Sequence, residues 1–149
     1  MRIHEFRSEV WLPRCIDEVF GFFSDAANLD AITPPWLNFQ VLTPAPVEMR
    51  VGALLDYKLR IRRFPFRWRS RITAWEPPHR FVDEQIRGPY RLWIHEHNFE
   101  VRDGGTLVRD HVRYAVPFDL LLHKLLVRRD VERIFAYRAE SLQRRFADG

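Results

Sequence analysis

The chain has 149 residues, of which 46% are hydrophobic, 14% aromatic and 30% charged. This length suits one domain, residues 1–149, with a sizeable core, and the composition excludes a disordered, collagen-like or disulfide-rich chain. The formal net charge is only +4, which does not by itself indicate a nucleic-acid partner, and we expect none.

The single cysteine, Cys15, has no partner for an internal disulfide or a thiolate metal site. The N-terminal stretch MRIHEFRSEVWLP carries charges where a secretory signal has an apolar run. No stretch approaches the roughly 18 apolar residues that a membrane span requires. We therefore expect a soluble, cytoplasmic protein.

The N-terminal third of the chain predicts one strand and two short helices. Residues 3–11 alternate loosely and form the expected strand, which Pro13 ends. Residues 15–32 group their apolar side chains at helical spacing, with a break at residues 24–25, where a serine or an aspartate can serve as the N-cap. The prolines of TPPWLNF (33–39) end the second helix because proline cannot continue one.

From about residue 38 to 116 the chain predicts about six antiparallel strands. Two of them, in residues 53–62 and 66–76, alternate apolar and polar positions. The inner faces expected for these two strands hold Leu55, Tyr57, Leu59 and Ile61, and Trp68, Ser70, Ile72 and Ala74. Residues 80–86 (RFVDEQI) form a shorter strand whose orientation the pattern leaves open. Its inner set is either Phe81, Asp83 and Gln85 or Val82, Glu84 and Ile86.

The last two strands, residues 92–101 and 106–116, flank RDGG, a strong hairpin signal. On the first of these strands, the mostly aromatic face holds Trp93, His95, His97 and Phe99. We therefore expect this face to point inward. A two-residue loop places His97 opposite Asp110 or Val112. A three-residue loop would turn the charged set Arg109, His111 and Arg113 inward, and the apolar pattern rejects it. We therefore expect Asp110 close to both histidines.

From Asp119, a plausible N-cap, to about Ala147 the apolar period changes to three and four residues. A helix of roughly 27 residues, about 40 Å long, is expected here. Its apolar positions are Leu121, Leu122, Leu125, Val131, Ile134, Phe135, Leu142 and Phe146. The predicted fold is α+β: a curved antiparallel sheet of about six to seven strands wraps around this helix, with two short helices after the first strand. A single helix rarely fills such a sheet, so we expect a cavity.

His95, His97 and Asp110 admit several interpretations. A buried polar cluster of this kind is usually hydrogen-bonded and structural. It can also hold the polar end of an otherwise apolar ligand, or transfer protons. Two histidines and a carboxylate can bind a metal, and His-x-His followed by an acid is also found in cupins. Here the following acid, Glu100, falls on the outer face and the long terminal helix does not suit a cupin, so we expect no metal and no cofactor.

Arginines and aromatic residues interleave in RIRRFPFRWRSR, residues 60–71. This pattern occurs in single-stranded nucleic-acid sites and in segments that contact anionic membranes. Arg67, Arg69 and Arg71 are also the outward half of an alternating strand, where charge protects a sheet from aggregation. A solvated outer face is the simplest interpretation, and transient membrane contact through Arg60 to Arg71 is the alternative.

Three phrases, EVFGFFSDAANLDAITPPWLNF, WEPPHRFVDEQIRGPYRLWIHEHNF and GTLVRDHVRYAVP, resemble the SRPBCC or START-like superfamily, and in particular its bacterial ligand-binding SRPBCC subfamily. The resemblance runs along nearly the whole chain. It implies a helix-grip fold with a deep cavity between sheet and helix, and it carries no catalytic residues over. Trp36 fits the subfamily pattern near the cavity mouth, as a lid contact.

We expect the cavity to bind a small hydrophobic molecule that is lipid, isoprenoid or polyketide-like. The expected apolar wall consists of Tyr57, Trp68, Trp93, Phe99 and Tyr114, and Gln85 joins the polar lining if its strand faces inward. His95, His97 and Asp110 would hold a polar head group. The alternative is a cyclase or dehydratase that uses His95 or His97 as acid or base, with Asp110 orienting it. The sequence leaves the ligand, any reaction and the oligomeric state open.

Overall fold

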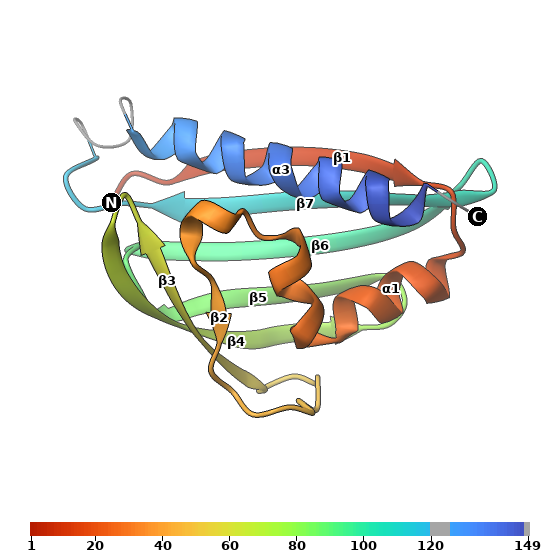
Figure 1. Ribbon diagram of the computed structural model, residues 1–149, viewed down its shortest axis with the longest axis horizontal. Helices are drawn as coiled ribbons and strands as arrows, with labels where there is room; N and C mark the ends of the chain where they lie inside the picture. Colours follow the sequence, from red (N-terminus) through yellow and green to blue (C-terminus); the bar gives the residue numbers. More distant parts are fainter. Residues whose placement is uncertain (120–125, 148–149) are drawn as a thin grey trace.

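In the computed structural model, one antiparallel sheet of seven strands, in the order β1-β7-β6-β5-β4-β3-β2, curves behind the C-terminal helix α3 (Figure 1). The structure describes residues 1–119 and 126–147. The strands are β1 (His4–Leu12), β2 (Gln40–Val41), β3 (Leu54–Ile61), β4 (Phe64–Glu76), β5 (Arg80–Arg87), β6 (Leu92–Arg102) and β7 (Gly105–Ala115). This is the predicted α+β helix-grip architecture.

The segment after β1 folds as predicted into α1 (Ile16–Ser24) and a 3₁₀ helix, η1 (Ala26–Ile32). Asp25 separates them and caps the second, because its carboxylate accepts a hydrogen bond from the backbone N–H of Ala27 at 3.0 Å. A further 3₁₀ turn, η2 (Pro35–Leu37), lies within the prolines that were expected only to end the helix. Proline fits the first turn of a helix, where its missing N–H would have no partner.

The helix α3 (Arg128–Phe146) forms the C-terminal part of the long predicted helix. Its apolar positions Val131, Phe135, Leu142 and Phe146 are buried, as its period indicates. The predicted positions at 121, 122 and 125 lie outside the described residues. Within the described parts of the chain, no helix is long and apolar enough to cross a membrane.

The β6–β7 hairpin has the predicted two-residue turn at Asp103 and Gly104, since Arg102 pairs with Gly105. Both turn residues have positive φ, 49° and 75°, the conformation of turns that match strand twist. The resulting register places His97 directly opposite Asp110. The prediction that this carboxylate lies beside the histidines is confirmed.

One expected face assignment is wrong. A register shift between Ile72 and Ala74 leaves an extra residue, Thr73, in β4. A bulge of this kind exchanges the two faces beyond it. Trp75 therefore turns inward, where its ring lies 5.2 Å from that of Phe20. Ala74, which strict alternation places inside, lies on the outer face in a groove with Thr73.

Candidate functional site

A cavity of about 180 Å³ lies between the concave face of the sheet and α3. This volume is close to the roughly 150 Å³ of a cavity that accommodates one benzene ring. The lining is mostly apolar and aromatic, with a polar end at Asp83, His95, His97 and Arg138. The apolar and aromatic lining residues are Leu29, Leu37, Phe39, Tyr57, Leu59, Ile61, Trp68, Tyr90, Trp93 and Ile134.

The expected wall residues divide into two groups. Tyr57, Trp68 and Trp93 line the cavity. Phe99 and Tyr114 are 3% and 2% exposed and belong to the packed core on either side of it. The difference follows from their neighbours, since the phenylalanines of α1 pack over Phe99, whereas Tyr114 belongs to the cluster that packs β7 against α3.

Gln85 has a different role from the expected polar lining. Its side-chain amide donates to the carbonyl of Tyr90 at 2.7 Å and accepts from the N–H of Tyr90 at 3.1 Å. The chain passes close to this amide at Gly88, where an added Cβ would lie 2.3 Å from the Gln85 amide oxygen and the Gln85 side chain would have to shift. Gln85 thus holds the turn between β5 and β6 and positions Tyr90 in the cavity wall.

The two histidines of β6 reach carboxylates on opposite neighbouring strands. His95 Nε2 lies 2.7 Å from Asp110 Oδ1 on β7, and His97 Nε2 lies 2.6 Å from Asp83 Oδ2 on β5. Because an ionised carboxylate only accepts hydrogen bonds, each Nε2 carries the proton and donates. The inward orientation of Asp83 also settles the open question of β5: Phe81 and Asp83 belong to its inner set.

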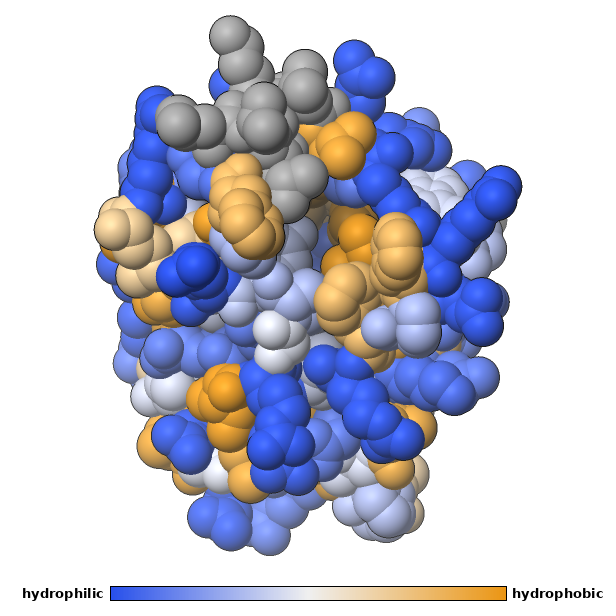
Figure 2. Space-filling view, turned by 90° about the vertical axis from the view of Figure 1, so that its left-hand side faces the viewer, coloured by the Kyte–Doolittle hydropathy of each residue, from blue (hydrophilic) through white to orange (hydrophobic). Residues whose placement is uncertain are grey.

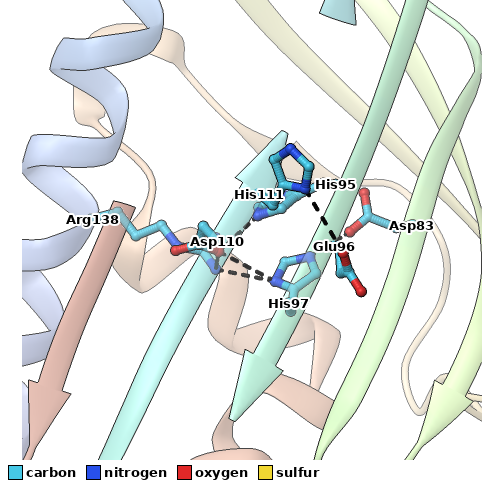
Figure 3. Close-up of polar contacts among 7 residues, drawn as sticks. All are labelled: Asp83, His95, Glu96, His97, Asp110, His111 and Arg138. Atoms are coloured by element: carbon cyan, nitrogen blue, oxygen red, sulfur yellow. Dashed lines mark hydrogen bonds and ion pairs between the residues drawn. The ribbon is translucent and has the colours of Figure 1, made fainter. Parts of the chain in front are cut away.

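Arg138 reaches from α3 into this cluster (Figure 3). Its Nη2 lies 3.1 Å from Asp110 Oδ1 and 3.3 Å from His97 Nδ1. Arginine only donates, so His97 Nδ1 accepts and His97 is held as a neutral imidazole with both nitrogens occupied. Sequence patterns missed Arg138, because an arginine between apolar helix positions is typical of a solvated face.

The rings stack into a short column beside these hydrogen bonds. The His95 and His97 centroids are 3.6 Å apart, and the His97 ring lies 4.0 Å from that of Phe81 and parallel to it within 12°. Burial in this column, together with the neighbouring His95, lowers the pKa of His97 to about 4, although Asp83 opposes the shift. His97 is therefore uncharged at neutral pH.

Both carboxylates stay ionised despite their surroundings. Burial raises the pKa of Asp110, but Arg138 and the hydrogen bond from His95 outweigh it and hold that pKa below its usual range. Burial likewise raises the pKa of Asp83, but the hydrogen bond from His97 and the neighbouring charges, including that of Arg138, together outweigh burial, so this pKa is also lowered.

His95 is the group that this network leaves available. Its Nε2 is bound to Asp110, while its Nδ1 has no hydrogen-bond partner within residues 1–119 and 126–147. The residue lines the cavity. A carboxylate that fixes one imidazole nitrogen and leaves the other directed at a cavity is suited to accept a hydrogen bond, or a proton, from a bound molecule.

Asp83, His95 and His97 also bring one potential metal-ligand atom each within 4.8 Å of one another. Two of these residues are already hydrogen-bonded to each other, and the Arg138 guanidinium lies 3.3 Å from His97. A divalent cation would have to displace a proton from His97 Nε2 and sit close to this fixed positive charge. The donor set therefore suits proton exchange better than metal binding.

A second, outer hollow of about 620 Å³ adjoins the cavity at the end of the molecule that Figure 2 faces. The two share the side chains of Leu37, Ile61, Tyr90 and Ile134, which form the junction between them. Trp36 lines the outer hollow, is 48% exposed and lies under the guanidinium of Arg133 at 4.7 Å. The expected mouth contact is thus placed at the entrance to the cavity.

A curved sheet that grips a helix around an apolar cavity defines the helix-grip class of ligand-binding and polyketide cyclase-type folds. The family described as polyketide cyclase / dehydrase and lipid transport matches residues 12–142, and the chain belongs to it. The resemblance to the SRPBCC superfamily is thereby confirmed. No curated protein matches the sequence significantly.

Solved structures share the fold at low sequence identity. Protein CV1439 from Chromobacterium violaceum is 15% identical with a TM-score of 0.75, over 98% of this chain and 99% of its own. Norcoclaurine synthase from Thalictrum flavum is 13% identical with a TM-score of 0.70, over 99% and 88%. The di-domain ARO/CYC StfQ from the steffimycin biosynthetic pathway is 14% identical with a TM-score of 0.70, over 95% and 48%. Identity this low supports the fold alone.

Proposed function

We propose that the protein binds a small hydrophobic molecule, of lipid, isoprenoid or polyketide type, with its polar group at His95. The observation that carries this proposal is His95 Nδ1, which has no hydrogen-bond partner among the described residues and belongs to the polar end of a mostly aromatic and apolar cavity. The cavity of about 180 Å³ takes a single ring or a short branched segment. The remainder of a larger ligand extends past Ile134 into the outer hollow.

Native mass spectrometry of the gently purified protein tests this proposal. A co-purified adduct of a few hundred daltons identifies the ligand class. In a parallel titration, the apolar fluorophore N-phenyl-1-naphthylamine should bind the wild type and fail to bind Ile134→Trp, which fills the junction. The matched control is Val101→Trp, at a position that is 66% exposed and outside the cavity. Equal binding to both variants would place the probe elsewhere and contradict the proposal.

A second candidate function is acid–base catalysis in the same cavity. The favouring observation is the His95–Asp110 pair at 2.7 Å, in which the carboxylate fixes the tautomer and orientation of the imidazole. In this proposal His95, rather than His97, exchanges the proton, since both His97 nitrogens are occupied. The names norcoclaurine synthase and ARO/CYC show that two proteins of this fold are named for reactions.

The replacement His95→Gln separates the two functions. An amide donates to Asp110 and accepts from a ligand but does not titrate. If the protein only binds, His95→Gln retains the adduct and the ligand is recovered unchanged. If it is an enzyme, the variant retains binding, while only the wild type converts the identified ligand into a product with a different mass or retention time.

We also propose a cytoplasmic location. The chain has one cysteine, and Cys15 is exposed and unpaired, which fits a reducing compartment. Fractionation of the expressing cells tests this, and recovery in a membrane or extracellular fraction would contradict it.

A further inference from the structure

Exposed aromatic side chains from three separate parts of the chain lie at the outer hollow or beside it: Trp36 and Phe118 line it, and Phe64 directly follows the lining residues Arg62 and Arg63. Phe64 is 67% exposed at the start of β4, Phe118 is 81% exposed after β7, and Trp36 is 48% exposed in η2. Figure 2 looks at this end of the molecule, where hydrophobic and hydrophilic side chains are interspersed around a hollow. Large apolar side chains gathered at one end of a soluble protein mark a contact surface.

The β3–β4 turn presents two of the charges at this entrance. Arg62 and Arg63 form the turn with φ of 49° and 75°. Residues with a Cβ lose about 1–2 kcal/mol in this left-handed conformation, which glycine or asparagine adopts far more readily. Arginine is therefore not selected here by turn geometry. The tip of the hairpin thus carries two arginines that its geometry does not require.

The charge around the entrance is positive on balance. Among the described residues that line the outer hollow, three are arginines, Arg62, Arg63 and Arg133, and one is acidic, Asp130. Asp130 is bound by Arg62 through two contacts of 2.9 and 3.1 Å. Arg63 and Arg133 have no acidic partner in the described ranges 1–119 and 126–147, so that they are available to an external anion.

We propose that this rim, comprising Trp36, Arg62, Arg63, Phe64, Phe118 and Arg133, docks on the surface of an anionic phospholipid bilayer. Aromatic rings partition into the interfacial region of a bilayer, and arginine pairs with phosphate in two parallel hydrogen bonds. Docked in this way, the hollow opens toward the hydrocarbon, and an apolar molecule enters or leaves without crossing water.

The sequence suggested transient membrane contact through Arg60 to Arg71, and only part of this segment lies at the rim. Arg67 and Arg71 point outward from the convex side of β4, away from the hollow, and Arg69 is paired with Asp56 at 2.7 Å. Only the tip of the hairpin lies at the rim. The docking surface therefore combines residues 62–64 with two segments that are remote in sequence, and it does not depend on what the cavity holds.

Vesicle co-sedimentation of the full chain tests the proposal. We expect the wild type to sediment with phosphatidylglycerol–phosphatidylcholine vesicles, less with pure phosphatidylcholine, and less again as NaCl is raised. Phe64→Ser combined with Phe118→Ser should weaken binding by about tenfold or more, since two buried rings are lost. The matched control replaces Val101 and Trp11, which are 66% and 41% exposed, by serine at the opposite end and should bind like the wild type.

Two results with vesicles would overturn the proposal: wild-type protein that stays in the supernatant with anionic vesicles, or equal losses in the two double variants. Tighter binding to single-stranded RNA than to vesicles, independent of Phe64 and Phe118, would also overturn it. Circular dichroism of each variant reports whether it is folded. The N-phenyl-1-naphthylamine titration of wild-type protein reports on the cavity alone, so the rim and the cavity proposals can fail separately.

Discussion

The two faces of β6 and β7 use the same side-chain chemistry in different surroundings. On the inner face His95 pairs with Asp110 at 2.7 Å, and on the outer face His111 pairs with Glu5 at 2.9 Å. The inner side chains are 7% and 4% exposed, whereas the outer ones are 24% and 51% exposed. Because Asp110 and His111 are sequence neighbours, only the alternation of the strand separates a buried pair from one in water.

This difference in exposure determines how much the loss of one partner destabilises the protein. A buried charge that loses its partner keeps its full desolvation cost, so removal of one member is strongly destabilising. An exposed pair is hydrated when separate and is screened by salt, so it contributes little. The outer face of β6 and β7 is a network of this second kind, with Arg80–Glu96 and Arg109–Glu9 beside the His111 pair. Four predictions test whether the contrast holds, and they are ordered by the size of the expected effect.

The largest effect is expected for Asp110→Asn. The amide keeps the size of the side chain but removes the carboxylate that the guanidinium of Arg138 contacts at 3.1 Å in a buried site. We expect the free energy of unfolding to fall by about 3–5 kcal/mol, the usual result of breaking a buried ion pair. Urea denaturation at pH 7 measures it. A loss below about 1 kcal/mol would mean that water reaches this cluster and that the inner face behaves like the outer one.

The second largest effect on stability is expected from acidification, through protonation of His97. Its pKa in the folded protein is about 4, below the value of about 6.5 in an unfolded chain. The unfolded chain therefore binds the proton more readily, and stability is lost as the pH falls from about 6.5 toward 4. Between pH 7 and pH 5 this residue alone should cost about 2 kcal/mol. The lowered pKa values of Asp83 and Asp110 act only below about pH 4.

The comparison variant for this pH effect is His97→Gln. It removes the titrating group and retains an amide that can donate to Asp83. We expect it to be less stable than the wild type at pH 7, but to lose about 2 kcal/mol less on going to pH 5. Urea titrations at both pH values give the difference. Parallel pH profiles for variant and wild type would show that His97 is not buried in its neutral form.

A smaller effect is expected from Glu96→Gln on the outer face. Arg80 lies 2.5 Å from this carboxylate and its hydrogen bond lowers the pKa of Glu96, but the two side chains are 34% and 31% exposed. We expect a loss of about 0.5–1 kcal/mol in the same urea assay. A loss as large as that of Asp110→Asn would remove the distinction between the faces.

The smallest effect is expected from salt. In about 1 M NaCl, where the Debye length is about 3 Å, the difference between Glu96→Gln and the wild type should disappear. The deficit of Asp110→Asn should persist, because ions do not enter the buried cluster. Measuring both variants at low and high salt sharpens the comparison, and a deficit of Asp110→Asn that salt abolishes would argue against burial.

The sequence predicted the structure best where a pattern is local. The RDGG turn fixes the register of β6 against β7, and that register alone brings Asp110 beside His95 and His97. Where the pattern is short or interrupted, the sequence did not determine which side chains face inward. The parity of β5 stayed open, so Asp83 was not assigned to the site, and the extra residue at Thr73 reversed the face of Ala74.

The strand alternation, the hairpin turn and the helical period are set by backbone geometry over a few residues, and the sequence by itself determined them together with the helix-grip fold. Only the tertiary structure decided that Arg138 neutralises Asp110 and that His95 is left facing the cavity. It also decided that the rim gathers Trp36, Phe64 and Phe118. These contacts join residues far apart in the chain, and their energies depend on exclusion of water, which no local pattern encodes.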